Sequence, residues 1–206
     1  MVDYFALLDE PRRPWIDPDK LKAKLVATAA EVHPDRVHTC PDDEKLNATG
    51  RSAQLNAAYQ CLGEPKARVL HLLELELGAK PKEIERTPQA MMDLFFQIGP
   101  VLRDVDGFLA ERAKVASPLL RVQRLEQGLG WMDELNALLR TIKVQRERMF
   151  EELQAMNVRW ETAQETPPPE RREALPLDRL EQIYRVLSYL SRWSDQIQAR
   201  LLELSL

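Results

Sequence analysis

Residues 17–36, which read DPDKLKAKLVATAAEVHPDR, decide the fold that the sequence predicts. Asp17 is a favourable N-cap and Pro18 suits the first helical position, so we expect a helix that starts there and runs to about residue 32. Pro34 ends this helix, because a proline moves the residue before it out of the α region. The helix should therefore end in a stiff, charged turn, His33-Pro34-Asp35.

The same helix is predicted to have a buried stripe and a basic face. The spacing of one helical face is kept by Leu21, Leu25, Thr28 or Ala29, and Val32. Lys20, Lys22 and Lys24 lie off that stripe, so we expect them on the polar face. Taken alone they favour an ordinary solvated surface, and beside the turn the two interpretations, solvated surface and binding face, are about even.

A second long helix is predicted after the turn. A polar loop covers residues 35–41, and the acidic residues 42–44 then favour a helix start because they complement the helix dipole. Gly63 is a plausible C-cap for this helix. Two helices joined by such a turn predict an antiparallel pair with His33-Pro34-Asp35 at its tip. Shorter helices are expected at residues 3–8 and 66–77.

The second half of the chain is predicted to be a bundle of long helices. An apolar helix starts at Gln89, and Gly99-Pro100 should kink or break it, because proline removes a hydrogen bond and clashes with the preceding turn. A long helix follows from about residue 117 to 163, then a proline-rich break at 166–169, then a last helix at 177–204. The expected seam of the long helix is Leu125, Leu129, Met132, Leu135, Leu139, Ile142, Met149, Leu153, Met156 and Trp160.

The sequence therefore predicts an all-α protein of two parts. We expect an N-terminal domain at residues 1–78, a linker at 79–87 and a C-terminal helical bundle at 88–206. The chain has 206 residues, of which 44% are hydrophobic and 30% charged, as in ordinary globular proteins. The net charge of −4 argues against a nucleic-acid partner. Isolated cysteines, the lack of an apolar span and the lack of an N-terminal leader predict a cytoplasmic protein with no membrane partner.

No set of residues predicts an enzyme. The sequence has no glycine-rich phosphate loop and no Ser/His/Asp or Cys/His set with supporting context, so we assign no catalytic residue and no cofactor. His38 and Cys40 could form a metal pair by residue type. No second pair stands at ligand spacing, so no metal site is predicted.

Three blocks of sequence beside the turn resemble a known family. They are Asp3 to Leu8 (DYFALL), Leu55 to Leu62 (LNAAYQCL) and Glu64 to Leu75 (EPKARVLHLLEL). Together with the HPD turn they resemble a J domain, and the subtype resembles HscB, the J-type co-chaperone of iron–sulfur cluster assembly. The resemblance covers residues 3–77, whereas the second half resembles HscB in architecture more than in residues.

This resemblance implies that the chain is a co-chaperone and not itself an ATPase. It implies that His33, Pro34, Asp35 and Arg36 engage a DnaK/HscA-type chaperone and promote its ATP hydrolysis. Proline would fix the turn and lower the entropy of ordering it. Lys20, Lys22 and Lys24 would meet an acidic surface of the chaperone and make the association rate sensitive to salt.

The resemblance also implies a client, the scaffold protein on which iron–sulfur clusters are built. The positions that correspond to its binding site are Met91, Met92, Phe95 and Phe96. Four apolar residues in six cover more than one helical face, so core and exposed patch stay equally open for them. Two alternatives remain for the function: a J-domain co-chaperone for another client, and a helical interaction module with a vestigial J domain.

Overall fold

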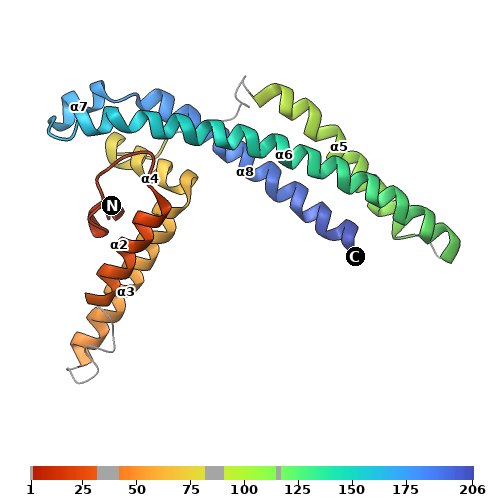
Figure 1. Cartoon of the computed structure of the whole chain (residues 1–206), viewed down its shortest axis with the longest axis horizontal. Coiled ribbons are helices and arrows are strands. Elements are labelled where there is room, and N and C mark those ends of the chain that lie inside the picture. The colour runs from red at the N-terminus through yellow and green to blue at the C-terminus, as the bar shows by residue number, and fades with distance from the viewer. Residues whose placement is uncertain (1, 32–41, 82–90, 115–116) are drawn as a thin grey trace. The chain divides into compact units, whose positions relative to one another are not determined.

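A computed structural model of the chain contains α-helices and no strand in the residues that it describes, which are 2–31, 42–81, 91–114 and 117–206. The all-α fold predicted from the sequence is thereby confirmed. The helices are α1 Tyr4–Leu7, α2 Pro18–Glu31, α3 Asp42–Gly63, α4 Pro65–Leu77, α5 Met92–Arg112, α6 Pro118–Thr162, α7 Pro168–Ala174 and α8 Leu177–Ser205 (Figure 1).

The chain forms two compact units. Unit 1 comprises Met1–Lys82 and Phe150–Tyr184, and unit 2 comprises Glu83–Met149 and Arg185–Leu206. Helices α6 and α8 each contribute residues to both units. The domain limits expected from the sequence, 1–78, 79–87 and 88–206, stay a prediction, and the units add that residues 150–184 pack with the N-terminal part.

In unit 1, helices α2 and α3 lie side by side (Figure 1), and α1 and α4 both pack against α3. The core is built from apolar residues at helical spacing. Its fully or almost fully buried members, on these helices and in the segment between α1 and α2, include Phe5, Leu8, Ile16, Leu21, Leu55, Ala58, Leu62, Val69, Leu72 and Leu73. Helix α4 ends at Gly78, whose φ of 72° lies in the left-handed region that glycine adopts without steric penalty.

In unit 2, helices α5, α6 and α8 share one apolar core. Its buried residues are Met91, Leu94, Ile98, Leu102, Val105, Phe108, Leu135, Leu138, Ile142, Val186, Leu190, Trp193, Ile197 and Leu204. Most of the predicted α6 seam from residue 132 onward is buried or packed against a core. Leu125 and Leu129 are wrong as seam residues, because their side chains are 60% and 55% exposed. Helix α8 ends before the α5–α6 pair does (Figure 1), which leaves this stretch of α6 uncovered on one side.

The predicted interruption at Gly99-Pro100 is not a break, since α5 is one helix with Pro100 inside it. Pro100 lacks the N–H that would bond the carbonyl of Phe96. Both residues are exposed, so the unpaired carbonyl lies on the solvent side, where water can bond it. The proline-rich segment does separate α6 from α8, but Pro168 and Pro169 also begin the short helix α7.

Candidate functional site

Helices α2 and α3 carry the first candidate site. The side chain of Asp17 accepts hydrogen bonds from the backbone N–H groups of Asp19 (2.9 Å) and Lys20 (3.3 Å), and this capping starts α2 where the sequence predicts. The turn itself, His33 to Arg36, lies outside the described residues, as do His38 and Cys40. The contribution of these four turn residues to binding therefore stays a prediction.

The three predicted lysines of α2 differ in their surroundings. Lys20 and Lys22 are exposed. Lys24 is not free, because its Nζ lies 2.7 Å from a carboxylate oxygen of Glu10 and also donates to the carbonyl of Asp9. The Glu10 side chain is only 1% exposed and pairs with Arg13 as well. The exposed basic face of α2 thus consists of Lys20 and Lys22.

Arg68 ties the loop before α2 to the end of α3. Its guanidinium is buried and donates to the carbonyls of Pro14 (2.9 Å) and Leu62 (2.5 Å). Burial lowers the pKa of Arg68 to about 10, so the side chain stays charged at neutral pH. Periodicity placed Arg68 in the helix but did not reveal this role, because a charged residue on a helical face is ordinarily solvated.

The N-terminal helix α1 is held through Asp3 and His71. The Asp3 carboxylate caps α1 and pairs with Arg12 (2.7 Å). Partial burial acts to raise the pKa of Asp3, but hydrogen bonds from Arg12 and from two backbone N–H groups hold it below its usual value. The Nε2 of His71 accepts the Tyr4 N–H at 3.1 Å, and its ring stacks on Phe5 with centroids 5.9 Å apart. The DYF start thus docks onto α4.

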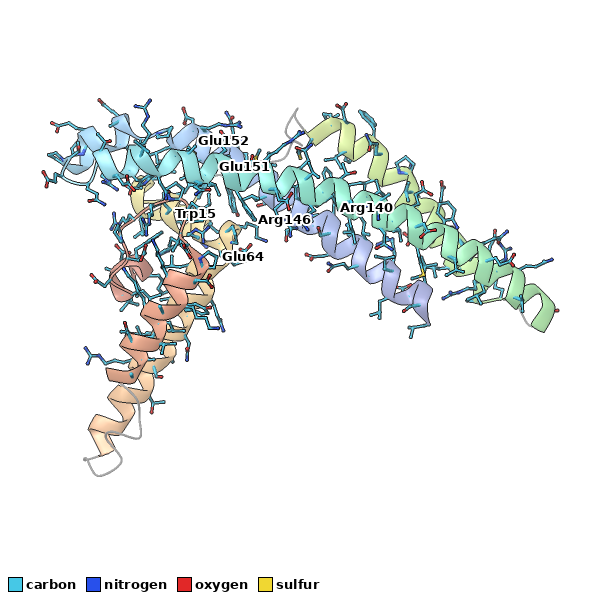
Figure 2. All side chains as sticks on the ribbon, viewed as in Figure 1. Trp15, Glu64, Arg140, Arg146, Glu151 and Glu152 are labelled. Atoms are coloured by element: carbon cyan, nitrogen blue, oxygen red, sulfur yellow. The ribbon has the colours of Figure 1, made fainter. Side chains whose placement is uncertain are left out.

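Within unit 1, two further contacts join the end of α6 and helix α7 to the N-terminal residues. Asn157 is buried, accepts the Trp15 N–H and donates to the Trp15 carbonyl, both at 3.0 Å; Trp15 is labelled in Figure 2. Arg171 of α7 forms a two-point ion pair with Glu76 of α4, at 3.0 and 2.9 Å, with side chains 11% and 4% exposed. No local pattern in the sequence indicates these pairs, because their partners stand 142 and 95 residues apart.

The second candidate site is the N-terminal end of α5. Met91 is buried in the unit 2 core and Met92 is partly buried, whereas Phe95 and Phe96 are 46% and 65% exposed. The two rings meet edge to face with centroids 5.8 Å apart. The sequence left open whether these residues are buried in the core or form an exposed patch. Met91 is a core residue, whereas Phe95 and Phe96 form an exposed patch. We call these two residues the aromatic pair.

Exposed polar residues surround the aromatic pair. Asp93 precedes it and Gln97 follows it, and both are exposed. Exposed aromatic side chains with a polar rim are typical of a protein-binding surface.

The described part of the chain contains no helix whose length and apolar character would allow it to span a membrane.

Similar sequences and similar solved structures point to one family. No family model matches the chain. It is 40% identical over 73 residues to a protein named Co-chaperone protein HscB homolog from Azoarcus sp., and 39% identical over 85 residues to one of the same name from Chromobacterium violaceum. Over 131 residues it is 31% identical to the HscB homolog of Bordetella pertussis, a match that covers 59% of this chain and 75% of that protein.

The matched region is shorter in the first two relatives. It spans 41% and 48% of their lengths, which is about half of each protein. Two solved structures share the fold over nearly the whole chain. They are the chaperone HscB from Vibrio cholerae, with a TM-score of 0.60, 19% identity and 96% of each chain covered, and the human co-chaperone protein HscB, with a TM-score of 0.55, 21% identity and 97% and 82% covered.

Proposed function

Because this chain belongs to the HscB co-chaperone family, we propose that it recruits a DnaK/HscA-type ATPase chaperone to a client protein and stimulates ATP hydrolysis by that chaperone. Its client in this proposal is the scaffold protein of iron–sulfur cluster assembly. The observation that carries the proposal is the pairing, in one chain, of a J-like helical hairpin with an exposed aromatic pair. The chain needs no catalytic residue or cofactor for this function, because the partner hydrolyses the ATP.

The hairpin supports the chaperone-binding half of the proposal. Helices α2 and α3 pack side by side, and residues 33–36 belong to the segment of sequence that connects them. Lys20 and Lys22 are exposed on α2 and available to an acidic surface, whereas Lys24 is engaged by Glu10. We therefore assign chaperone binding to His33, Pro34, Asp35 and Arg36, with Lys20 and Lys22 steering the encounter.

The aromatic pair supports the client-binding half. Phe95 and Phe96 expose large apolar surfaces on consecutive positions of α5, and burial of aromatic side chains dominates the energetics of many interfaces. Met92, partly buried beside them, can adapt to a partner surface. Met91 would contribute indirectly, because it is buried and holds the start of α5 on the core.

The cytoplasm stays the predicted location, because isolated cysteines are typical of a reducing compartment.

A steady-state ATPase assay tests the first half. The purified wild-type chain should raise the ATPase rate of a cognate chaperone, and the His33→Gln variant should not. Circular dichroism of both proteins serves as the control for folding. If the two proteins gave equal rates, only a helical interaction module with a vestigial J domain would remain.

Binding to the purified iron–sulfur scaffold tests the second half. We expect Phe95→Ala/Phe96→Ala to weaken binding by about 2 kcal/mol or more, or about thirtyfold, as for aromatic hot spots. Leu202→Ala is the matched control, because Leu202 is 65% exposed in unit 2 but outside the aromatic pair. No scaffold binding by the wild type at tens of micromolar would favour a different client, with the ATPase result unaffected.

A further inference from the structure

A groove runs between α5 and α6 in unit 2, beyond the aromatic pair. Its volume is about 730 Å³, and it is a shallow groove open to solvent and not an enclosed pocket. Phe108 and Trp131 supply its aromatic surface, and Phe108 is nearly buried while Trp131 is partly exposed. The lining residues from α5 start at Arg103, seven positions after Phe96. The groove is thus a different surface from the aromatic pair.

Two glycines inside helices keep this groove open. Gly107 of α5 and Gly130 of α6 both line it. Glycine in a helix interior is less stable than alanine, and a Cβ atom at either position would meet no other atom within 4 Å. Close packing therefore does not explain either glycine. What both have in common is that a side chain in their place would narrow the groove.

The charges on the walls favour a cationic group. Arg124 is already engaged, because it pairs with Glu111 at 2.9 Å and lies over the Phe108 ring at 5.8 Å. Asp104 and Glu134 are exposed on opposite walls, and the described residues supply neither with an ion-pair partner. Arg103 is the one other cation on the lining. Two carboxylates thus stand against one guanidinium beside the partly exposed indole of Trp131.

We propose that this groove is a second peptide-binding site, which takes a short segment with an arginine or lysine side chain between apolar residues. The cation would lie over Trp131 and pair with Glu134 or Asp104, while one apolar neighbour would contact the small part of Phe108 that stays exposed beside Arg124. The α5 wall from Asp104 to Glu111 is roughly 10 Å long at 1.5 Å per residue. That length holds about three residues of extended chain.

Two matched peptides test the proposal on the full-length protein. The probes are acetyl-Leu-Arg-Leu-amide and acetyl-Leu-Glu-Leu-amide, titrated into 15N-labelled protein while the indole N–H signal of Trp131 is followed by NMR. Trp131→Phe identifies that signal. We expect the arginine peptide to shift it with an affinity about tenfold higher than that of the glutamate peptide. No shift at millimolar peptide, or equal or stronger binding of the glutamate peptide, would overturn the proposal.

Substitutions in the groove give an independent test. Gly107→Leu should fill the groove and reduce the affinity for the arginine peptide at least tenfold, whereas Gly99→Leu should leave it unchanged. Gly99 is a matched control because it also lies in α5 with open space around its Cβ position, but it does not line the groove. Glu134→Gln, which keeps the shape and removes the charge, should weaken binding severalfold even if Gly107→Leu fails to fold. Wild-type affinity in Glu134→Gln and Gly107→Leu would refute the site.

Discussion

Lys22 and Lys24 stand two positions apart on α2, yet their charges have different uses. Lys24 neutralises the buried carboxylate of Glu10, while Lys22 is exposed. Lys24→Met should destabilise the protein by about 1–2 kcal/mol, because it takes one of two cations from a buried carboxylate. Lys22→Met should change stability by less than about 0.5 kcal/mol but slow association with the chaperone. Urea denaturation and stopped-flow binding measure the two effects.

The opposite pattern would contradict this division of roles. An unchanged denaturation midpoint in Lys24→Met would mean that the Glu10 pair does not form in solution. A stability loss in Lys22→Met would mean that Lys22 has a structural role of its own. An association rate that is insensitive to both substitutions and to salt would remove the lysines from the encounter altogether.

His71 should make the stability of unit 1 depend on pH. Burial lowers the pKa of His71 below 6.5, and the Arg12 charge adds to this, while Asp3 and Glu74 oppose it. A depressed pKa means that the unfolded chain takes up the proton first, so stability is full above about pH 6.5 and is lost as pH falls through the folded-state pKa. Protonation would also convert Nε2 from the acceptor of the Tyr4 N–H into a donor.

Urea denaturation at pH 7.5 and pH 5.0 checks this expectation, with His71→Gln as the matched variant. Glutamine keeps a side-chain acceptor but does not titrate. The wild type should therefore lose more stability between the two pH values than the variant does. An equal loss in both proteins would show that carboxylates elsewhere, and not His71, produce the acid sensitivity.

At the residue scale, sequence patterns predicted exposure better than they predicted partners. Lys20 and Lys22 are exposed, as expected for residues off a buried stripe, whereas the exposure of Phe96 was one of two placements that the apolar stretch left open. Arg68 and Glu10 are buried charges, and no periodicity distinguishes them from solvated ones. Their burial depends on carbonyls and cations supplied by other elements, which a local pattern does not contain.

At the scale of elements, the helix starts and ends followed the sequence rules closely. Asp17 with Pro18 begins α2, Pro65 begins α4 and Gly78 ends it, because capping is a local interaction. Pro100 does not break α5, because the carbonyl of Phe96, which loses its hydrogen-bond partner, belongs to an exposed residue and water can bond it. Leu125 and Leu129 keep the seam spacing but are exposed, because the apolar pattern of α6 extends past the end of α8, the helix that covers the rest of the seam.

The ion pair between Arg171 of α7 and Glu76 of α4 can be tested by substitution. Arg171→Met removes the partner of Glu76, whose side chain is 4% exposed, so we expect a destabilisation of about 3 kcal/mol. Arg172→Met is the matched control, since Arg172 is exposed on the same helix. The double variant Glu76→Leu/Arg171→Met should lose less stability than the sum of the single changes, because it leaves no buried charge. Thermal unfolding of the variants measures this, and additive losses would contradict the pair.

At the scale of the whole molecule, the sequence predicted the helices but not their grouping. Periodicity shows that a helix has an apolar face and does not identify the helix that covers it. The expected division at residues 79–87 follows composition along the chain. That division stays a prediction, to which the compact units add that residues 150–184 pack with the N-terminal part, through Asn157 and Arg171 among others.

This grouping predicts that residues 1–82 are not self-sufficient. A fragment of that length lacks Asn157, whose amide satisfies both backbone groups of Trp15, and the Arg171 partner of Glu76. Two hydrogen bonds at about 1 kcal/mol each, together with the ion pair, amount to about 3 kcal/mol or more. Because small domains have only about 5–15 kcal/mol of stability, the fragment should melt at a clearly lower temperature than the full chain.

A pair of neighbouring substitutions in the full chain separates this effect from that of shortening the protein. Asn157→Ala should lower the free energy of unfolding by about 2 kcal/mol, because the N–H and carbonyl of Trp15 lose their partner. Val158→Ala should have little effect, since Val158 is 63% exposed. Hydrogen exchange at the Trp15 amide should accelerate in Asn157→Ala alone. If exchange there is equal in both variants, and the fragment 1–82 melts with the full chain, the end of α6 does not support the hairpin and the J-like part folds independently.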